Sequence, residues 1–335
     1  MKNVLLLAFG MFALGFDAYV IAGLLPGISD TYQKSTSQVG QAVSIFTLFY
    51  AISAPLFSSL LAGKPIKKIL IWAMLLFTIA NSVTALAPTF SILLLSRAIA
   101  GTGAGLFSPL AVAASTKFVS SEKKGRALGL TIGGMSMGTV LGVPLGIYIS
   151  NLFDWKVTIW LLVMIGVISV LCMYTFLPDF PTTPPPALNE RLKMFLDKRV
   201  TITVGVTFFA SVASLGLYTY LAPLLEEMTS SSNLTMYLWA WGFGGLVGSI
   251  LIGYLIDYFG KPKTLVTIIL FTLTLSIICI PLMLNLPILK YLPFFVWGAM
   301  GWACQAPQQH ILLSHQPSAV ALNSSVNYLG SAIVL

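Results

Sequence analysis

The chain has 335 residues, of which 57% are hydrophobic and only 8% are charged, and its mean hydropathy is +0.91. Soluble globular domains carry about 25% charged residues, so this composition excludes an ordinary soluble protein and indicates an all-α protein that crosses a membrane many times. The formal net charge of +8 does not indicate nucleic-acid binding, because Lys and Arg in such a protein set its orientation in the membrane. The three cysteines lie in apolar stretches and neither histidine is near a Cys cluster, so we predict no disulfide framework, no metal site and no cofactor.

Apolar runs of about 20 residues, long enough to cross a bilayer as a helix, recur along the whole chain. We predict ten complete spans and the start of an eleventh near residue 320; the ten lie near 4–26, 38–61, 69–88, 91–115, 127–150, 157–178, 200–225, 235–257, 263–284 and 290–313. The first run is too long for a signal peptide, contains Asp17 and lacks a small-residue cleavage site, so it is assigned as a span. The sequence stops at Leu335 inside the eleventh run, and we therefore expect a C-terminally incomplete bundle.

Basic residues are distributed unevenly between the two sides of the predicted spans. With the N-terminus in the cytoplasm, only three basic residues face outward: Lys34, Lys156 and Lys290. Fourteen face inward: Lys2, Lys64, Lys67, Lys68, Lys117, Lys123, Lys124, Arg126, Arg191, Lys193, Lys198, Arg199, Lys261 and Lys263. This asymmetry predicts a cytoplasmic N-terminus and supports the number of spans.

The longest polar segment, 179–199, follows the sixth span. It begins with four prolines, which favour a stiff, extended chain, and continues as a basic amphipathic stretch expected at the inner membrane surface. We therefore predict an N-terminal six-helix half (1–178), a cytoplasmic linker (179–199) and a C-terminal half (200–335) truncated within its fifth helix.

The fifth predicted span contains an unusual density of glycine. Gly134, Gly138, Gly142 and Gly146 recur every four residues and so share one helix face, and Pro144 lies among them. A glycine face lets another helix approach closely, and a proline bends a helix where neighbouring groups satisfy its backbone. Two interpretations follow: a glycine dimerisation face, or a bent gating helix.

Two ionisable residues, Asp17 and Arg97, lie well inside predicted spans. Such residues are costly in a membrane and usually mark ion or substrate pathways. At 1.5 Å per residue, Asp17 lies ~20 Å and Arg97 ~21 Å from the inner boundary of a ~30 Å core. Their similar depth predicts that they face the same cavity. The alternative is a static ion pair that only fixes helix packing.

The stretch Gly138-Thr-Val-Leu-Gly142-Val-Pro144-Leu-Gly146 resembles the fifth-helix antiporter motif of the major facilitator superfamily, in its drug:proton antiporter branch. The family pattern usually places Pro directly after the second Gly. Here Val143 intervenes, as in a bacterial subgroup similar to sugar, nucleoside and chloramphenicol exporters. This resemblance implies a facilitator fold of two six-helix halves.

Two further stretches resemble the proton-coupled exporters of this family. The segment from Arg97 to Gly103 is similar to the fourth-helix signature Arg-x-x-x-Gly-x-Gly, and the segment from Gly15 to Pro26 is similar to the acid-bearing first helix. The resemblance implies that Asp17 takes and releases the proton and that Arg97 tunes it.

The loop after the eighth span, with Gly253, Asp257, Gly260 and Lys261, resembles the family's cytoplasmic loop signature. The corresponding loop of the first half (Ser59 to Lys68) has basic residues but no acid. Asp257 is expected to lie near the start of the fifth span, where the helix dipole favours a negative charge. The resemblance implies that Asp257 latches the two halves; the alternative is an ordinary positively charged inner loop.

Aromatic side chains within the spans are candidates for a substrate cavity, although aromatic residues in helices also occur in cores and facing lipid. The candidates are Phe16, Tyr19, Tyr50, Phe107, Phe209, Tyr218 and Tyr220.

These observations predict a secondary transporter of a bacterial inner membrane, expected to be monomeric, that exports a small molecule in exchange for protons. Its partners would be the substrate, protons and the bilayer. One alternative is a nutrient symporter or uniporter of the same fold, and another is an inactive truncated fragment of such a transporter. A membrane enzyme or receptor is a third class, but the spans contain no paired acids, Ser/Lys pair or His cluster, and the chain has no ATP-binding glycine-rich loop.

Overall fold

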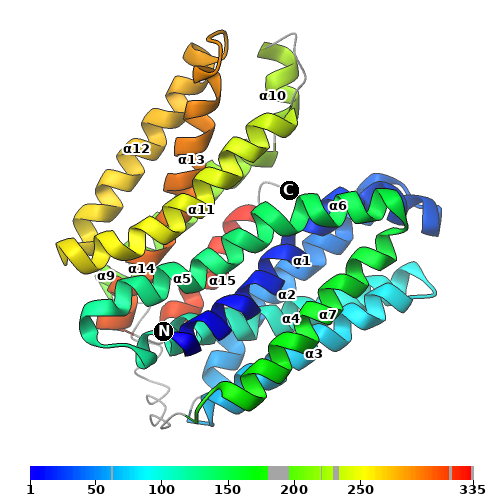
Figure 1. Ribbon diagram of the computed structural model, residues 1–335, viewed down its shortest axis with the longest axis horizontal. Helices are drawn as coiled ribbons and strands as arrows, with labels where there is room; N and C mark the ends of the chain where they lie inside the picture. The colour runs from blue at the N-terminus through cyan, green and yellow to red at the C-terminus, as the bar shows by residue number, and fades with distance from the viewer. Residues whose placement is uncertain (62, 180–195, 220, 229–233, 317–318, 333–335) are drawn as a thin grey trace.

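The structure is a computed structural model that describes residues 1–335 except 62, 180–195, 220, 229–233, 317–318 and 333–335. Its described part is helical (Figure 1). Nine helices in this part are long and apolar enough to cross a membrane. Most of the predicted linker, 180–195, lies outside the described residues, so its amphipathic stretch stays a prediction.

In the first group of helices, α4 packs against α2 and α3, α3 packs against α7, and α1 packs against α5. The group comprises α1 (Lys2–Tyr32), α2 (Thr36–Leu60), α3 (Ile66–Leu86), α4 (Phe90–Ser115), the short turns η1 (Thr116–Phe118) and η2 (Ser121–Lys123), α5 (Lys124–Met137), η3 (Gly138–Gly142), α6 (Val143–Leu152) and α7 (Trp155–Phe176).

The second group packs α13 against α11 and α12, and α15 against α9. The group comprises α9 (Lys198–Thr219), α10 (Leu221–Met228), α11 (Leu234–Phe259), α12 (Pro262–Met283), the turn η5 (Leu289–Tyr291), α13 (Leu292–Ala303), α14 (Gln305–His315) and α15 (Ala319–Ala332). The division of the chain into halves at 1–178 and 200–335 stays a prediction, because α11 also packs against α5 and α15 against α2.

The predicted tenth span, 290–313, is not one continuous helix. α13 ends at Ala303, Cys304 is a turn residue, and α14 begins at Gln305. Pro307 explains the break, because it has no backbone N–H to donate to the carbonyl of Ala303, four residues earlier. At its far end, α14 is tied to the start of α9, since Asp197 Oδ2 lies 2.8 Å from His315 Nε2.

The fifth predicted span is also irregular, and its glycines pack inside the first group. η3 is a π-helix that ends two residues before Pro144, where the missing proline N–H loosens the regular hydrogen-bond ladder. A Cβ atom added to Gly134 or Gly138 would lie 2.1 Å from a backbone carbonyl oxygen of α1. Gly142 and Gly146 pack against the ring of Phe16, which also belongs to α1. The glycine face is therefore used within the chain, and it is not the dimerisation face that one interpretation predicted.

We expect Gly138→Ala to lower the stability of the folded protein by about 1–3 kcal/mol, because the added methyl group collides with the α1 backbone and not with a movable side chain. Thermal unfolding followed by fluorescence-detected gel filtration measures this effect. Gly40→Ala is the matched control, since a Cβ atom there meets nothing within 4 Å. Equal melting temperatures for the two variants would contradict the packing described.

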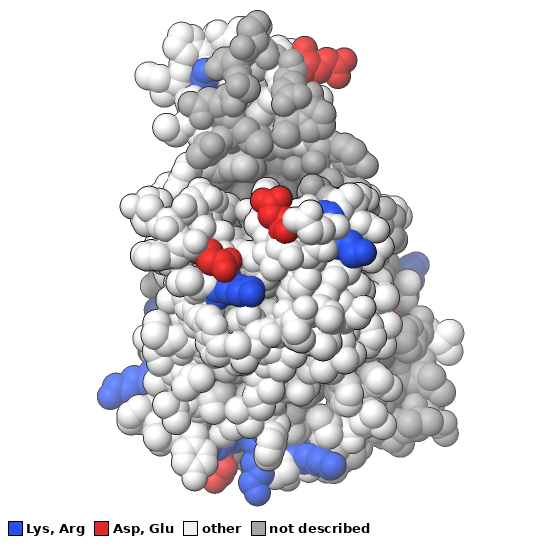
Figure 2. All heavy atoms as spheres, turned by 90° about the vertical axis from the view of Figure 1, so that its right-hand side faces the viewer, with Lys and Arg blue, Asp and Glu red and all other residues white. Residues whose placement is uncertain are grey.

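The two groups meet along two seams, α5 against α11 and α2 against α15. Gly125 packs against Gly253, and Val140, inside η3, packs near Gly242. Figure 1 shows α5 and α11 side by side there. The two groups lie farther apart at the other end, where α6 and α10 are found. We call the end of the bundle where α1 and α5 begin the basic face, because these helices start at Lys2 and Lys124. Figure 2 looks onto the other end, where scattered charged side chains lie on a largely uncharged surface.

Candidate functional site

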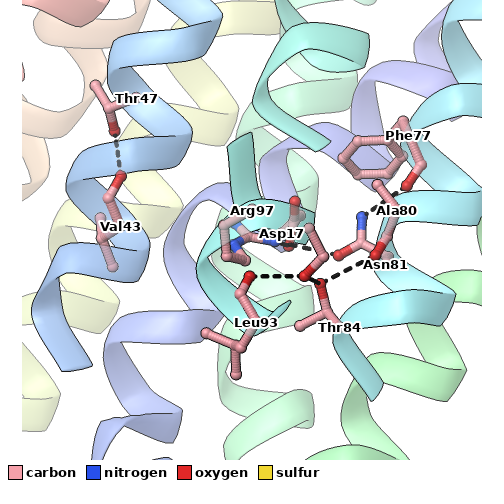
Figure 3. Close-up of polar contacts among 10 residues, drawn as sticks. Asp17, Val43, Thr47, Phe77, Ala80, Asn81, Thr84, Leu93 and Arg97 are labelled. Carbon is pink, nitrogen blue, oxygen red and sulfur yellow. Dashed lines mark hydrogen bonds and ion pairs between the residues drawn. The ribbon is translucent and has the colours of Figure 1, made fainter. Parts of the chain in front are cut away.

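An ion pair lies inside the first group of helices. Arg97 Nη1 of α4 donates to Asp17 Oδ1 of α1 at 2.8 Å, and the two side chains are 1% and 0% exposed (Figure 3). The two residues predicted to lie at similar depth are thus in direct contact. Neither lines a described pocket, so their facing a common cavity stays a prediction. Regular helices make the prediction of similar depth possible, since the rise per residue converts sequence position into depth.

Two residues that sequence reasoning missed complete the environment of Arg97. The Nη1 atom also donates to Asn81 Oδ1 of α3 at 3.1 Å, and the amide nitrogen of Asn81 donates to the carbonyl of Phe77 at 3.1 Å, which fixes its orientation. The guanidinium of Arg97 lies 4.5 Å above the ring of Phe46 on α2, a cation–π contact. A lone amide in the apolar run 69–88 was the signal available for Asn81.

The ion pair is not fully satisfied. Asp17 Oδ2 and Arg97 Nε are buried and have no hydrogen-bond partner among the described residues. Leaving a buried polar atom without a partner lowers the stability of the folded protein by about 1–3 kcal/mol. These two atoms therefore destabilise the site. One carboxylate oxygen of Asp17 is therefore able to accept a proton without first breaking a hydrogen bond.

A central cavity lies between the two groups and consists of two adjoining pockets. Tyr19, Trp302, Gln305 and Asn327 line both pockets. One pocket is completed mainly by the second group, with Thr207, Ala210, Ser211, Ser214, Trp241, Leu273, Gly301, Cys304 and Gln308. The other is completed by Met11, Tyr50, Ser108, Val112, Ile132, Met135, Gln309, Ser324 and Tyr328. The amide side chains were missed by sequence reasoning, although the cluster of Gln residues near the end of the tenth span was a visible signal.

The predicted aromatic residues fall in different places. Tyr19 and Tyr50 line the cavity, and the ring of Tyr218 lies 6.4 Å from Tyr19 at its border. Phe16 is fully buried against the glycines of the fifth span. Phe209 is 72% exposed on the outer surface of α9, so its assignment to the cavity was wrong.

Of the remaining aromatic candidates, Phe107 packs against Gly10 within the first group, and Tyr220 lies outside the described residues. α9 buries a stripe of four polar residues, Thr203, Thr207, Ser211 and Ser214, and exposes its more apolar face, on which Phe209 lies.

Asp257, at the end of α11, contacts the start of α5. Its Oδ1 accepts from the backbone N–H of Gly125 at 2.7 Å, and its Oδ2 accepts from that of Arg126 at 3.0 Å. The side chain of Arg126 approaches the same carboxylate, with Nε at 3.4 Å from Oδ2. Asp257 thus occupies the position expected for it, where the helix dipole and the unpaired N–H groups of α5 stabilise a negative charge.

The other residues of this loop have structural roles. Gly253 allows α11 to approach α5, because an added Cβ atom would lie 2.7 Å from the carbonyl oxygen of Gly125. Gly260 has a φ of 61°, a left-handed conformation that turns the chain from α11 into α12. Lys261 precedes the first residue of α12 and is exposed on the basic face.

The sequence profile of the Major Facilitator Superfamily matches residues 7–335. The chain belongs to this family. Facilitators are transporters, so the protein is a multi-pass membrane transporter and not an enzyme, and the site described above lies inside a facilitator fold.

Relatives of the same family extend over nearly the whole chain. The MFS-type transporter YbcL of Bacillus subtilis is 29% identical over 331 residues, which cover 97% of this chain and 84% of YbcL. The inner membrane transport protein YdhP of Escherichia coli K12 is 27% identical over 336 residues, covering 98% of this chain and 86% of YdhP. A structure of the proton:xylose symporter XylE bound to 6-bromo-6-deoxy-D-glucose superposes with a TM-score of 0.82 at 16% identity, covering 99% of this chain and 86% of XylE; it shows the fold.

Proposed function

We propose that the protein is a proton-coupled antiporter that exports a small molecule across a bacterial inner membrane, with its basic face and N-terminus in the cytoplasm. The observation that carries the proposal is the buried Asp17–Arg97 pair in a transporter fold. The antiport direction and the drug:proton branch rest on the resemblance of the fifth helix. The orientation rests on the excess of basic residues at one end of the bundle.

In this mechanism, protonation of Asp17 removes the negative charge that Arg97 faces. The guanidinium keeps two contacts when this happens, the amide oxygen of Asn81 and the ring of Phe46. These neutral partners hold Arg97 in place while Asp17 is uncharged, so the proton can come and go without unfolding the site.

A change at Arg97 has a short route to the seam between the two groups. The ring of Phe46 lies 6.5 Å from that of Tyr50, one helical turn further along α2. Tyr50 in turn contacts Tyr328 of α15, with ring centroids 3.7 Å apart. Movement of Phe46 would therefore reach both the cavity wall and the α2–α15 seam, which is the kind of connection that alternating access requires.

Asp257 joins the end of α11 to the start of α5 at the basic face. In the proposed cycle, the contact of Asp257 with the start of α5 stabilises the state open to the other side, and it breaks when the cavity opens to the cytoplasm. The first-half loop, with Lys64, Lys67 and Lys68 but no acid, offers no equivalent acidic contact. Opening would then depend mainly on the α5–α11 seam.

The second candidate function is proton symport, which the shared fold with the proton:xylose symporter XylE favours. The sign of proton movement separates the two candidates. Proteoliposomes loaded with a pH-sensitive dye would receive D-xylose, uridine or tetraphenylphosphonium from outside. An antiporter makes the lumen more alkaline as substrate enters, whereas a symporter makes it more acidic. Substrate uptake with no change in lumen pH would refute proton coupling of either kind.

A further inference from the structure

We propose that Tyr328 of α15 carries the proton between the central cavity and Asp17, and that Tyr50 of α2 holds the Tyr328 hydroxyl in position for this transfer. The inference deepens the proposed function and rests on it in taking Asp17 as the group that binds the proton. It names the route by which the proton reaches that group, and this route is the same for antiport and for symport.

Asp17 has no direct opening to the cavity. Its side chain is 0% exposed, and it lines neither of the described pockets. The side of α1 that faces the cavity carries Met11 and Tyr19. At about 100° of rotation per residue, Asp17 lies about 160° around the helix from Tyr19 and about 120° from Met11. A group from another helix is therefore needed to carry the proton past α1.

Tyr328 lies between the cavity and the ion pair. It lines one of the two pockets, and its side chain is only partly buried. Its helix, α15, packs against α2 and also against α4, whose Arg97 holds the carboxylate of Asp17. The negative charge of Asp17 acts on the Tyr328 hydroxyl. This hydroxyl therefore borders the cavity and also lies within the electric field of the carboxylate.

The contacts of Met135 place the Tyr328 hydroxyl beside the relevant part of α1. The hydroxyl donates toward Met135 Sδ at 3.7 Å. The backbone of Met135 packs against Gly15, since a Cβ atom added to Gly15 would collide with the Met135 carbonyl oxygen. Gly15 precedes Asp17 by two residues on α1. The Tyr328 hydroxyl is therefore held next to the turn of α1 that carries Asp17.

Tyr50 fixes the Tyr328 hydroxyl from the first group of helices. The hydroxyl of Tyr50 forms hydrogen bonds with those of Tyr328 and Ser108. The two tyrosine rings lie against each other, with centroids 3.7 Å apart, and Tyr50 is 1% exposed. Tyr50 is thus a rigid support, and we assign it the role of a positioning residue for the transfer through Tyr328.

A tyrosine hydroxyl suits this transfer, because the same oxygen donates and accepts. During uptake, the Tyr328 oxygen takes a proton from water in the cavity while its own proton passes to Asp17 Oδ2, which has no partner in the described structure. One O–H bond forms at the tyrosine as another breaks, so Tyr328 ends neutral and Asp17 ends protonated. Release follows the same steps in reverse.

The route crosses the seam between the two groups of helices. Tyr50 belongs to α2 and Tyr328 to α15, and these two helices pack against each other there. Separation of the seam would carry Tyr328 away from Tyr50 and from Asp17. Asp17 would then exchange protons with the cavity only while the α2–α15 seam is closed, which links proton movement to the conformation of the transporter.

Time-resolved infrared spectroscopy of the purified full chain after a pH jump tests the proposal. The carbonyl band of protonated Asp17, identified by its absence in Asp17→Asn, reports both the final degree of protonation and its rate. We expect Tyr328→Phe, which removes only the hydroxyl, to slow protonation about tenfold to a hundredfold and to leave the final band unchanged. Tyr50→Phe should slow it by a smaller factor.

Tyr237→Phe is the matched control, because Tyr237 is also buried but packs against Phe294 of α13 and lines neither described pocket. It should leave the rate unchanged. Tyr328→His keeps a side chain that both donates and accepts, so it should recover much of the rate lost in Tyr328→Phe. A purely structural role of the ring predicts no such recovery.

An unchanged rate in Tyr328→Phe, or a weaker final band at a normal rate, would overturn the proposal. If a tyrosine variant misfolds, Ser108→Ala gives the same test, because it removes a hydroxyl bonded to Tyr50 and leaves both rings in place. Slower protonation is expected there too, and an unchanged rate would contradict the proposal. Slow protonation in the variants, combined with substrate uptake that leaves the lumen pH unchanged in the unmodified protein, would refute the proposed function and leave this route intact.

Discussion

Replacing Asp17 by Asn is expected to abolish transport driven by a pH gradient while leaving the amount of folded protein roughly unchanged. Asparagine has nearly the same shape and keeps an oxygen able to accept from Arg97, but it cannot take up a proton. Breaking a buried ion pair usually costs about 3–5 kcal/mol. In the variant, Asn81 and Phe46 still contact the guanidinium of Arg97. We therefore expect the loss of folding stability to lie at the lower end of this range.

The measurement is substrate accumulation in proteoliposomes with an imposed pH gradient, alongside substrate counterflow at equal pH. The variant should lose the first and keep the second, because counterflow needs no net proton transfer. Asp30→Asn, the same substitution at the exposed far end of α1, should behave like the unmodified protein. Full accumulation in Asp17→Asn would show that another group carries the proton.

Replacing Asp257 by Ala is expected to open the basic face. The substitution removes two hydrogen bonds between a carboxylate and backbone N–H groups, each worth about 1.5–3 kcal/mol, together with a favourable charge at the start of α5. Part of this loss is regained when water solvates the freed N–H groups. We expect the equilibrium between closed and open basic faces to shift about tenfold to a hundredfold.

Spin labels at Lys123 and Lys263, both exposed at the basic face, would report this shift as a longer distance population. The three native cysteines would first be replaced. Glu122→Ala is the matched control, because this acid lies next to the start of α5 and is exposed. If the distance distribution of Asp257→Ala matched that of the control, the carboxylate would have no part in holding the basic face closed.

These two residues were predictable for different reasons. Asp17 and Arg97 are rare charges in apolar runs, and helix geometry alone converts their positions into a common depth. Asp257 was found because its loop, with Gly253 and Gly260, resembles the family's cytoplasmic loop signature. The structure explains the two glycines by close approach and by the turn. In each case a strong local constraint is visible in the sequence.

The cavity wall was less predictable, for physical reasons. Gln308 and Gln309 are neutral, and they contact side chains of other helices, Thr207 of α9 and Ser324 of α15, which the local sequence does not reveal. Phe209 was misplaced because its aromatic ring alone does not show which way it points. The available signal was the buried polar stripe of α9, formed by Thr203, Thr207, Ser211 and Ser214, which marks the inward face. The break at Cys304 had a signal in Pro307, but prolines also occur in continuous membrane helices, as Pro26 does within α1.

The two glycine faces of the fifth span differ in a way that bears on what substitutions there would affect. Toward α1, the glycines receive backbone carbonyl groups so closely that even one added carbon has no room, whereas toward α11 the helices meet glycine to glycine at Gly125 and Gly253. The first surface joins α5 and the helix after it to α1 within one group. The second joins the two groups, and it carries charge at its end, where Asp257 and Arg126 meet. Substitutions on the first surface should therefore act on folding, whereas substitutions on the second should act on how readily the two groups separate.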